Sequence, residues 1–126
     1  MADTIGIVED DPSLRTTLGR QLSALSYRVQ LFASAEEFLA AASTVQASLL
    51  LVDVDLGGTS GPSLVHQLSS AGFRFPIVFM TGSCDEKIRK KCIELGCVDF
   101  LQKPFEEDRL IRAIRAGIES SGDLQT

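Results

Sequence analysis

The sequence of 126 residues lacks long hydrophobic runs: its longest apolar stretches, such as SLLLV at 48–52, are only as long as one strand. A membrane-spanning helix needs about 20 apolar residues. The acidic N-terminus also lacks the pattern of a signal peptide. We therefore predict a cytoplasmic protein without a membrane span.

Positive charge and cysteine are scarce as well. Twelve Lys and Arg residues face 17 Asp and Glu residues, for a net charge of -5, which argues against a nucleic-acid-binding surface on this chain. The three cysteines, Cys84, Cys92 and Cys97, include no C-x-x-C pair. This pattern favours reduced thiols that act as small buried residues over a disulfide framework or a zinc site.

Apolar strand-like runs alternate with helical segments along the rest of the chain. The runs lie at 4–8, 28–32, 48–52, 76–80 and 98–101. They show little in-out alternation, as is typical of strands covered on both faces. This pattern predicts an α/β fold: a (βα)5 doubly wound parallel sheet of five strands in the order 2-1-3-4-5, like flavodoxin. We expect one domain over 1–119, followed by a polar tail or the start of a linker at 120–126.

Start and stop signals support the helices between these runs. Pro62 suits a first helical turn, and Ser34 with Glu37 forms a capping-box pattern. Gly72 and Gly96 stand where helices should end.

The predicted strand ends carry the chemistry. In a doubly wound sheet, ligands bind beyond the carboxyl ends of the strands, and here the first, third, fourth and fifth runs lead into Glu9 and Asp10, Asp53, Thr81, and Lys103. Gathered carboxylates repel one another unless a cation relieves their charge. Mg²⁺ fits best, because it takes one or two carboxylates and leaves positions for phosphate oxygens.

The same residues match the needs of phosphoryl transfer. Asp53 can act as a nucleophile, because a carboxylate forms an acyl phosphate without a base to activate it. Mg²⁺ held by Asp10 and Asp53 neutralises charge, Lys103 binds a phosphate oxygen, and Thr81 donates a hydrogen bond. Each residue also has a simpler interpretation: a helix cap, a turn residue, a strand end or a solvated side chain. Their shared position at one switch point favours the functional interpretation.

The segments VEDD, LVDVDLGGTSG, FMTG and DFLQKPF follow one another in this order. Over residues 4 to about 119 the chain thereby resembles a response-regulator receiver domain of two-component signalling, most closely of the FixJ type. The resemblance implies these roles: Glu9 and Asp10 as the acidic pair, Asp53 as the phosphoacceptor, the backbone carbonyl of Asp55 as a further Mg²⁺ ligand, Thr81 as the phosphate-sensing hydroxyl, Lys103 as the lysine before a cis bond to Pro104, and Phe100 as the switch aromatic.

The resemblance also implies the function. A histidine kinase would transfer a phosphoryl group to Asp53, and the domain would switch conformation to control an output domain or a partner protein, with transcription regulation as the expected setting. Such a domain is a signalling phosphoacceptor in a phosphorelay rather than an enzyme. Phe100 has an alternative role as an ordinary core residue of the last strand.

The loop after Asp53 departs from the family pattern. The family usually has proline four residues after the phosphoacceptor, where this chain has Gly57, followed by Gly58. We expect a looser loop and therefore weaker Mg²⁺ binding than with proline at 57. The Asp55 side chain either orients a hydrolytic water or faces solvent.

The segment 85–96 predicts a helix with two different faces. Ile88, Cys92 and Leu95 should pack on the sheet. The basic residues should lie outside, as a partner or homodimer surface or as a solvated face: Lys87, Arg89, Lys90 and Lys91. Cys84, in the loop just past Thr81, is a candidate for redox control.

Two rival functions remain. The D-x-D pattern of Asp53 and Asp55 also resembles the nucleophile motif of haloacid-dehalogenase-like phosphatases, although that family usually carries it on the first strand and adds a cap. A nucleotide-binding module lacks support, because no G-x-G-x-x-G or Walker pattern follows a strand. The sequence does not distinguish a stand-alone receiver from a piece of a longer transcription regulator, and it names neither the kinase nor the signal.

Overall fold

The fold is an alternation of five strands and five helices, seen in a computed structural model that describes residues 3–83 and 85–124. The elements are β1 (Thr4–Val8), α1 (Pro12–Ala24), β2 (Arg28–Phe32), α2 (Ala35–Ala41), β3 (Leu49–Asp53), α3 (Gly61–Ser70), β4 (Ile77–Thr81), α4 (Glu86–Glu94), β5 (Asp99–Gln102) and α5 (Glu107–Leu124).

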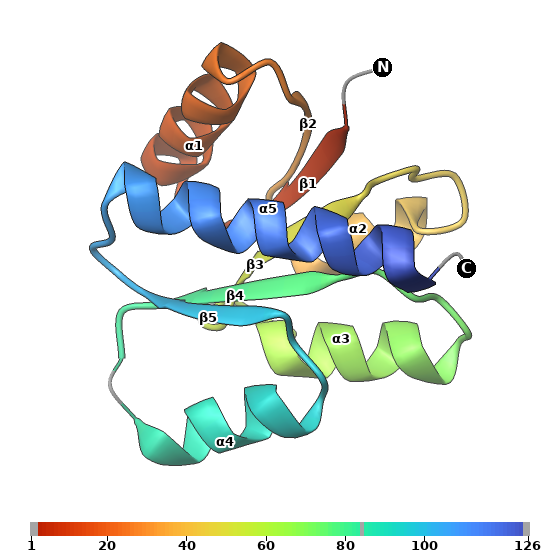
Figure 1. Cartoon of the computed structure of the whole chain (residues 1–126). Helices are drawn as coiled ribbons and strands as arrows, with labels where there is room; N and C mark the ends of the chain where they lie inside the picture. Colours follow the sequence, from red (N-terminus) through yellow and green to blue (C-terminus); the bar gives the residue numbers. More distant parts are fainter. Residues whose placement is uncertain (1–2, 84, 125–126) are drawn as a thin grey trace.

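All the strands pair in parallel, in the order β2-β1-β3-β4-β5. The predicted doubly wound topology is therefore confirmed. Helices α1 and α5 cover one face of the sheet, and α2, α3 and α4 cover the other (Figure 1).

The central strands contribute side chains to two separate hydrophobic clusters, one on each face of the sheet. On β3, Val52 packs with the side of α2, α3 and α4, whereas Leu51 packs with the side of α1 and α5. On β4, Phe79 and Met80 divide in the same way. Successive side chains of a strand point to opposite faces, so apolar residues at every position bury both faces of the sheet.

Three strands lie one residue further along the chain than predicted. Strand β3 ends with Asp53 and β4 ends with Thr81, so both residues belong to the sheet instead of following it. Pro76, just before β4, has no N–H to donate to the ladder, and only its carbonyl takes part, accepting from the Leu50 N–H at 2.9 Å. This shift gives the two functional candidates a rigid backbone.

The predicted helix signals are confirmed, with one change of detail. The Ser34 hydroxyl accepts from the Glu37 N–H at 3.0 Å, but the Glu37 carboxylate accepts from the Ala33 N–H at 3.2 Å and not from that of Ser34. Gly72 and Gly96 follow α3 and α4 at positive φ, 87° and 83°, which glycine adopts without steric cost.

Residues 120–124, which the sequence analysis places in a polar tail or linker, are helical, because α5 continues to Leu124. Adding a residue to an existing helix costs far less than starting one, and α5 is anchored on the sheet by Leu110, Ala113 and Ile114. None of the helices in the described residues is long and apolar enough to span a membrane.

Candidate functional site

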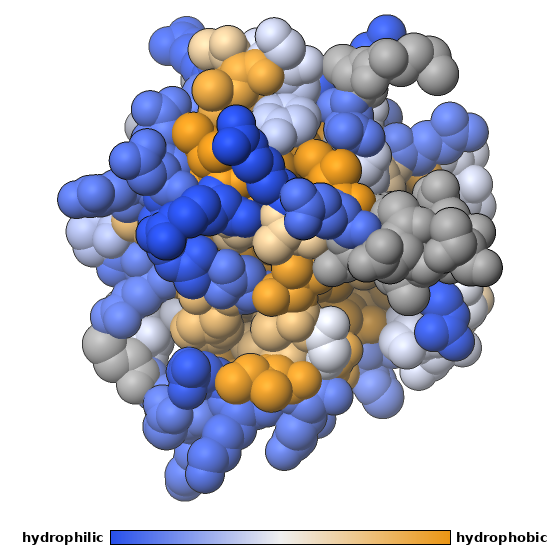
Figure 2. Space-filling model, viewed as in Figure 1, coloured by the Kyte–Doolittle hydropathy of each residue, from blue (hydrophilic) through white to orange (hydrophobic). Residues whose placement is uncertain are grey.

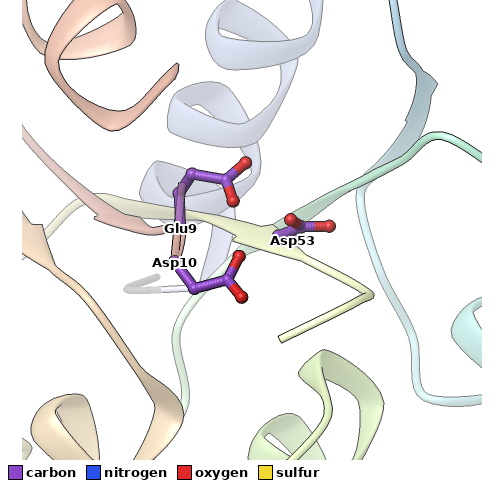
Figure 3. A group of neighbouring side chains, drawn as sticks. All are labelled: Glu9, Asp10 and Asp53. Atoms are coloured by element: carbon purple, nitrogen blue, oxygen red, sulfur yellow. The ribbon is translucent and has the colours of Figure 1, made fainter. Parts of the chain in front are cut away.

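Three carboxylates meet at the carboxyl ends of β1 and β3. One oxygen each from Glu9, Asp10 and Asp53 lies within 4.8 Å of the others, and Figure 3 shows the side chains converging from the two strands. Glu9 and Asp53 are buried, whereas Asp10 is exposed. Because β1 and β3 pair directly, residues 44 positions apart in the chain come together as predicted.

The acidic triplet at 9–11 divides into three roles. The Glu9 side chain points inward to Lys103, and Asp10 accepts from the Gly57 N–H at 3.2 Å. Asp11 is the N-cap of α1, with its Oδ1 accepting from the Ser13 N–H at 2.9 Å. The helix-cap interpretation therefore does not hold for Asp10, because Asp11 caps this helix.

Lys103 joins two of these carboxylates. Its Nζ lies 2.7 Å from Glu9 Oε1 and 3.0 Å from Asp53 Oδ2. Burial lowers the pKa of Lys103, but the hydrogen bonds to Glu9 and Asp53 outweigh it, so the pKa is raised and the ammonium stays charged. The bond from Lys103 to Pro104 is cis, as the resemblance implied.

The site carries more negative charge than Lys103 compensates. Burial, and then a hydrogen bond with Asp53, raises the pKa of Glu9 from 4.5 to about 7, although Lys103 acts in the opposite direction. A carboxyl that holds its proton near neutral pH marks a site where a further cation would be stabilising.

The donor set fits Mg²⁺. The oxygens of Glu9, Asp10 and Asp53 are hard ligands of the kind that Mg²⁺ binds in proteins. Asp10 is exposed, so an ion with its waters can reach the group from solvent.

Thr81 lies beside this group and already has a partner. It is fully buried, and its hydroxyl donates to Asp55 Oδ2 at 3.2 Å and accepts from the Ser83 N–H at 3.0 Å. The Asp55 side chain is thus bonded to Thr81, a role that the two sequence-based alternatives did not include. The Asp55 N–H in turn donates to Asp53 Oδ1 at 3.0 Å.

Phe100 lies on β5, half-buried against the cluster of α2, α3 and α4. It also lines a surface hollow of about 340 Å³ beside Ser83 and Arg89. Phe100 is therefore in contact with both the core and a space next to the loop that follows Thr81.

Helix α4 has the two faces that the sequence predicts. Cys92 is buried and Ile88 and Leu95 are partly buried against the core, while the basic residues are exposed: Lys87, Arg89, Lys90 and Lys91. Arg89 forms an exposed ion pair with Glu86 at 3.2 Å, which reduces the positive charge of this face. Figure 2 shows apolar side chains between α5 and α4, bordered by hydrophilic ones. Cys84 lies outside the described residues.

The sequence matches the family model of the response regulator receiver domain over residues 5–115. The chain belongs to the response-regulator receiver family. It is 34% identical over 117 residues to the transcriptional regulatory protein FixJ of Bradyrhizobium diazoefficiens, covering 93% of this chain and 57% of FixJ. It is 33% identical over 123 residues to the transcriptional regulatory protein TdiR of Thauera aromatica, covering 98% of this chain and 54% of TdiR.

Solved structures agree with this membership. The crystal structure of FixJ-N superposes with a TM-score of 0.88 at 32% identity, covering 94% of this receiver chain and 95% of FixJ-N. The receiver chain spans only about half the length of the curated relatives that it matches. The comparisons give no support to the phosphatase alternative.

Besides the contact of Thr81 with Asp55, the sequence-based prediction did not include the Gly57 N–H on Asp10 or the Thr59 N–H on Glu36 at 3.0 Å. Both donors are backbone groups, which residue types do not reveal. The glycines at 57 and 58 were the one sequence signal in this loop.

Proposed function

We propose that this receiver domain accepts a phosphoryl group on Asp53 from the phosphohistidine of a histidine kinase, with Mg²⁺ bound by Glu9, Asp10 and Asp53. The observation that carries the proposal is the buried Asp53 carboxylate, 3.0 Å from the Lys103 ammonium and next to two further acids. The backbone carbonyl of Asp55 is the proposed additional ligand.

Each residue of the site has a separate role in the proposed transfer. Asp53 Oδ1 is held by the Asp55 N–H, and Oδ2 lies on Lys103. A carboxylate oxygen forms the new bond to phosphorus as the bond from phosphorus to the histidine nitrogen breaks, and the electron pair remains on the imidazole. Lys103 is within reach of the new phosphate oxygens, and bound Mg²⁺ would supply charge neutralisation of the phosphoryl group.

Thr81 and Phe100 form the proposed switch. The Thr81 hydroxyl is bonded to Asp55, and a phosphoryl group on Asp53 offers stronger acceptors nearby. When the Thr81 hydroxyl exchanges its hydrogen bond to Asp55 for one to the phosphate, Thr81 moves toward Asp53. This movement opens space for Phe100 to turn inward. The phosphate shifts the equilibrium only through such differential contacts.

The wider role follows from the relatives. Several are named transcriptional regulatory proteins and are about twice as long as this chain. We propose that the phosphorylated domain controls an output domain or effector protein in transcription regulation in the cytoplasm. The α4 basic face is the proposed partner or homodimer surface, and the domain turns over no substrate of its own.

Incubation with acetyl phosphate and Mg²⁺, followed by intact-protein mass spectrometry, tests the proposal. We expect the mass of one phosphoryl group to be added to the unaltered chain and none to Asp53→Asn. Asp11→Asn is the matched control, because it removes a carboxylate that caps α1 outside the site. Equal labelling of Asp53→Asn, or no labelling of any form by acetyl phosphate or by a cognate kinase, would refute the proposal.

The same preparation tests the role of the Asp55 carboxylate and the dimer. Asp55→Asn keeps an acceptor for Thr81, so an unchanged acyl-phosphate lifetime rules out water orientation by the Asp55 carboxylate. Size measurement before and after phosphorylation shows whether the domain dimerises.

A further inference from the structure

The loop between β3 and α3 is firmly held at its two ends. Val54 and Leu56 are buried in the core, and Ser60 caps α3 by accepting from the Ser63 N–H at 3.2 Å. Between these anchors, Gly57 and Gly58 are exposed. The stretch 57–59 therefore has no anchor of its own in the core, and only contacts with neighbouring elements can hold it in place.

Two carboxylates from outside the loop hold that stretch. Asp10 Oδ2 accepts from the Gly57 N–H at 3.2 Å, and Glu36 Oε1 accepts from the Thr59 N–H at 3.0 Å. Gly58 lies between them at φ 89°, and a Cβ there would come within 3.2 Å of Glu36 Oε1. The glycine thus gives the positive φ and the close approach that the Glu36 contact needs.

Glu36 is well placed for this contact. It lies in the first turn of α2, two residues after the Ser34 cap, where a negative charge is stabilised by the helix. Hydrogen bonds from Thr59 hold the pKa of Glu36 below its usual range. The acceptor is therefore a carboxylate at neutral pH, and hydrogen bonds to charged groups are stronger than neutral ones.

The two contacts differ in their relation to the metal site. Asp10 belongs to the carboxylate group that fits Mg²⁺, whereas Glu36 does not. Any ion that draws the Asp10 carboxylate toward itself weakens the Gly57 contact, but the Thr59 contact stays intact. Glu36 alone can then keep a loop with two adjacent glycines ordered beside the ion.

We propose that Glu36 is a positioning residue for Mg²⁺ binding, acting through the Thr59 N–H on the loop that follows Asp53. The proposal rests on the proposed function, because it concerns the same metal site. Without Glu36, ion binding must also supply the free energy that orders residues 57–59, so the affinity for Mg²⁺ decreases.

Calorimetric titration of the unphosphorylated protein with Mg²⁺ tests this role. We expect Glu36→Ala to bind Mg²⁺ about threefold to tenfold more weakly, which corresponds to the net contribution of one ordinary solvent-exposed hydrogen bond. Glu36→Gln keeps an acceptor oxygen for Thr59 and should restore part of the affinity. The matched control is Glu37→Ala, which removes an equal charge from the same turn of α2 but no contact with the loop.

Amide hydrogen exchange provides a second measurement on the same variants. The Thr59 amide should exchange faster in Glu36→Ala than in Glu37→Ala. Equal Mg²⁺ affinities for Glu36→Ala and the unaltered chain, or equal weakening in Glu36→Ala and Glu37→Ala, would overturn the role of Glu36 alone. If the unaltered chain itself binds no Mg²⁺, the proposed metal site is refuted as well.

Discussion

The buried Glu9 carboxyl makes the stability of the metal-free protein depend on pH in an unusual direction. Its pKa is about 7, against an ordinary value of 4.5. Between these values the folded state binds a proton that the unfolded state releases, so the stability is fully present below about pH 4.5 and is lost as the pH rises through about 7.

The expected loss follows from the size of the shift. Each pKa unit corresponds to about 1.4 kcal/mol, and the Glu9 side chain is only 1% exposed, so solvent screening is small. The rise from 4.5 to about 7 therefore predicts that the free energy of unfolding decreases by about 3 kcal/mol between about pH 4.5 and pH 8.

Urea denaturation at several pH values in the presence of EDTA measures this decrease. Glu9→Gln cannot ionise, so its free energy of unfolding should change little over the same range. Glu94→Gln is the control, because Glu94 is exposed on α4 and its replacement should leave the pH dependence unchanged. Saturating Mg²⁺ should remove most of the loss, since the ion favours the ionised carboxylates.

The argument would fail if the metal-free protein became more stable between about pH 5 and pH 8. It would also fail if Glu9→Gln kept the full pH dependence of the unaltered chain. Either result would mean that the burial of this carboxyl does not set its protonation.

Three substitutions test other parts of the site. Lys103→Met leaves two buried carboxylates without their ammonium, so urea denaturation at neutral pH should show the free energy of unfolding reduced by about 3 kcal/mol. A reduction below about 1 kcal/mol would contradict the described ion pairs. Gly57→Pro stiffens the loop, so calorimetry should show tighter Mg²⁺ binding than in the unaltered chain, and no gain would count against the expectation of a loose loop. Gly57→Ala is the control, because it keeps the N–H that binds Asp10. Gly61→Ala places a Cβ against the backbone oxygen of Asp53, and it should cost about 2 kcal/mol of stability and slow phosphorylation by acetyl phosphate; normal values for both would contradict the close packing of α3 on β3.

The sequence predicted the topology and the grouping of the three carboxylates because both depend on local patterns. Apolar runs with a polar residue at the end mark strands buried on both faces, and parallel strands bring those end residues to one edge. Glu9, Asp10 and Asp53 meet for this reason. Strand limits were less predictable, because SLLLV and LLLVD suit β3 equally well until the pairing with β4 selects one.

The contacts that the sequence missed connect distant residues through the backbone. Glu36 is an ordinary acidic residue in the first turn of a helix, and its partner is an N–H 23 positions away. Asp55 and Thr81 meet only because β3 and β4 pair. Such contacts need the three-dimensional arrangement, since residue type and spacing leave them open.

The division of the strand residues between two clusters determines which helices are affected when residues at the sheet edge move. Val52, just before Asp53, packs beneath α2, α3 and α4, whereas Met80, just before Thr81, packs beneath α1 and α5. A pull that moves Asp53 and Thr81 toward each other therefore acts on both helical layers at once. If Asp53 is phosphorylated as proposed, partners docked on opposite sides of the molecule would respond to the same event, although neither would contact the phosphate.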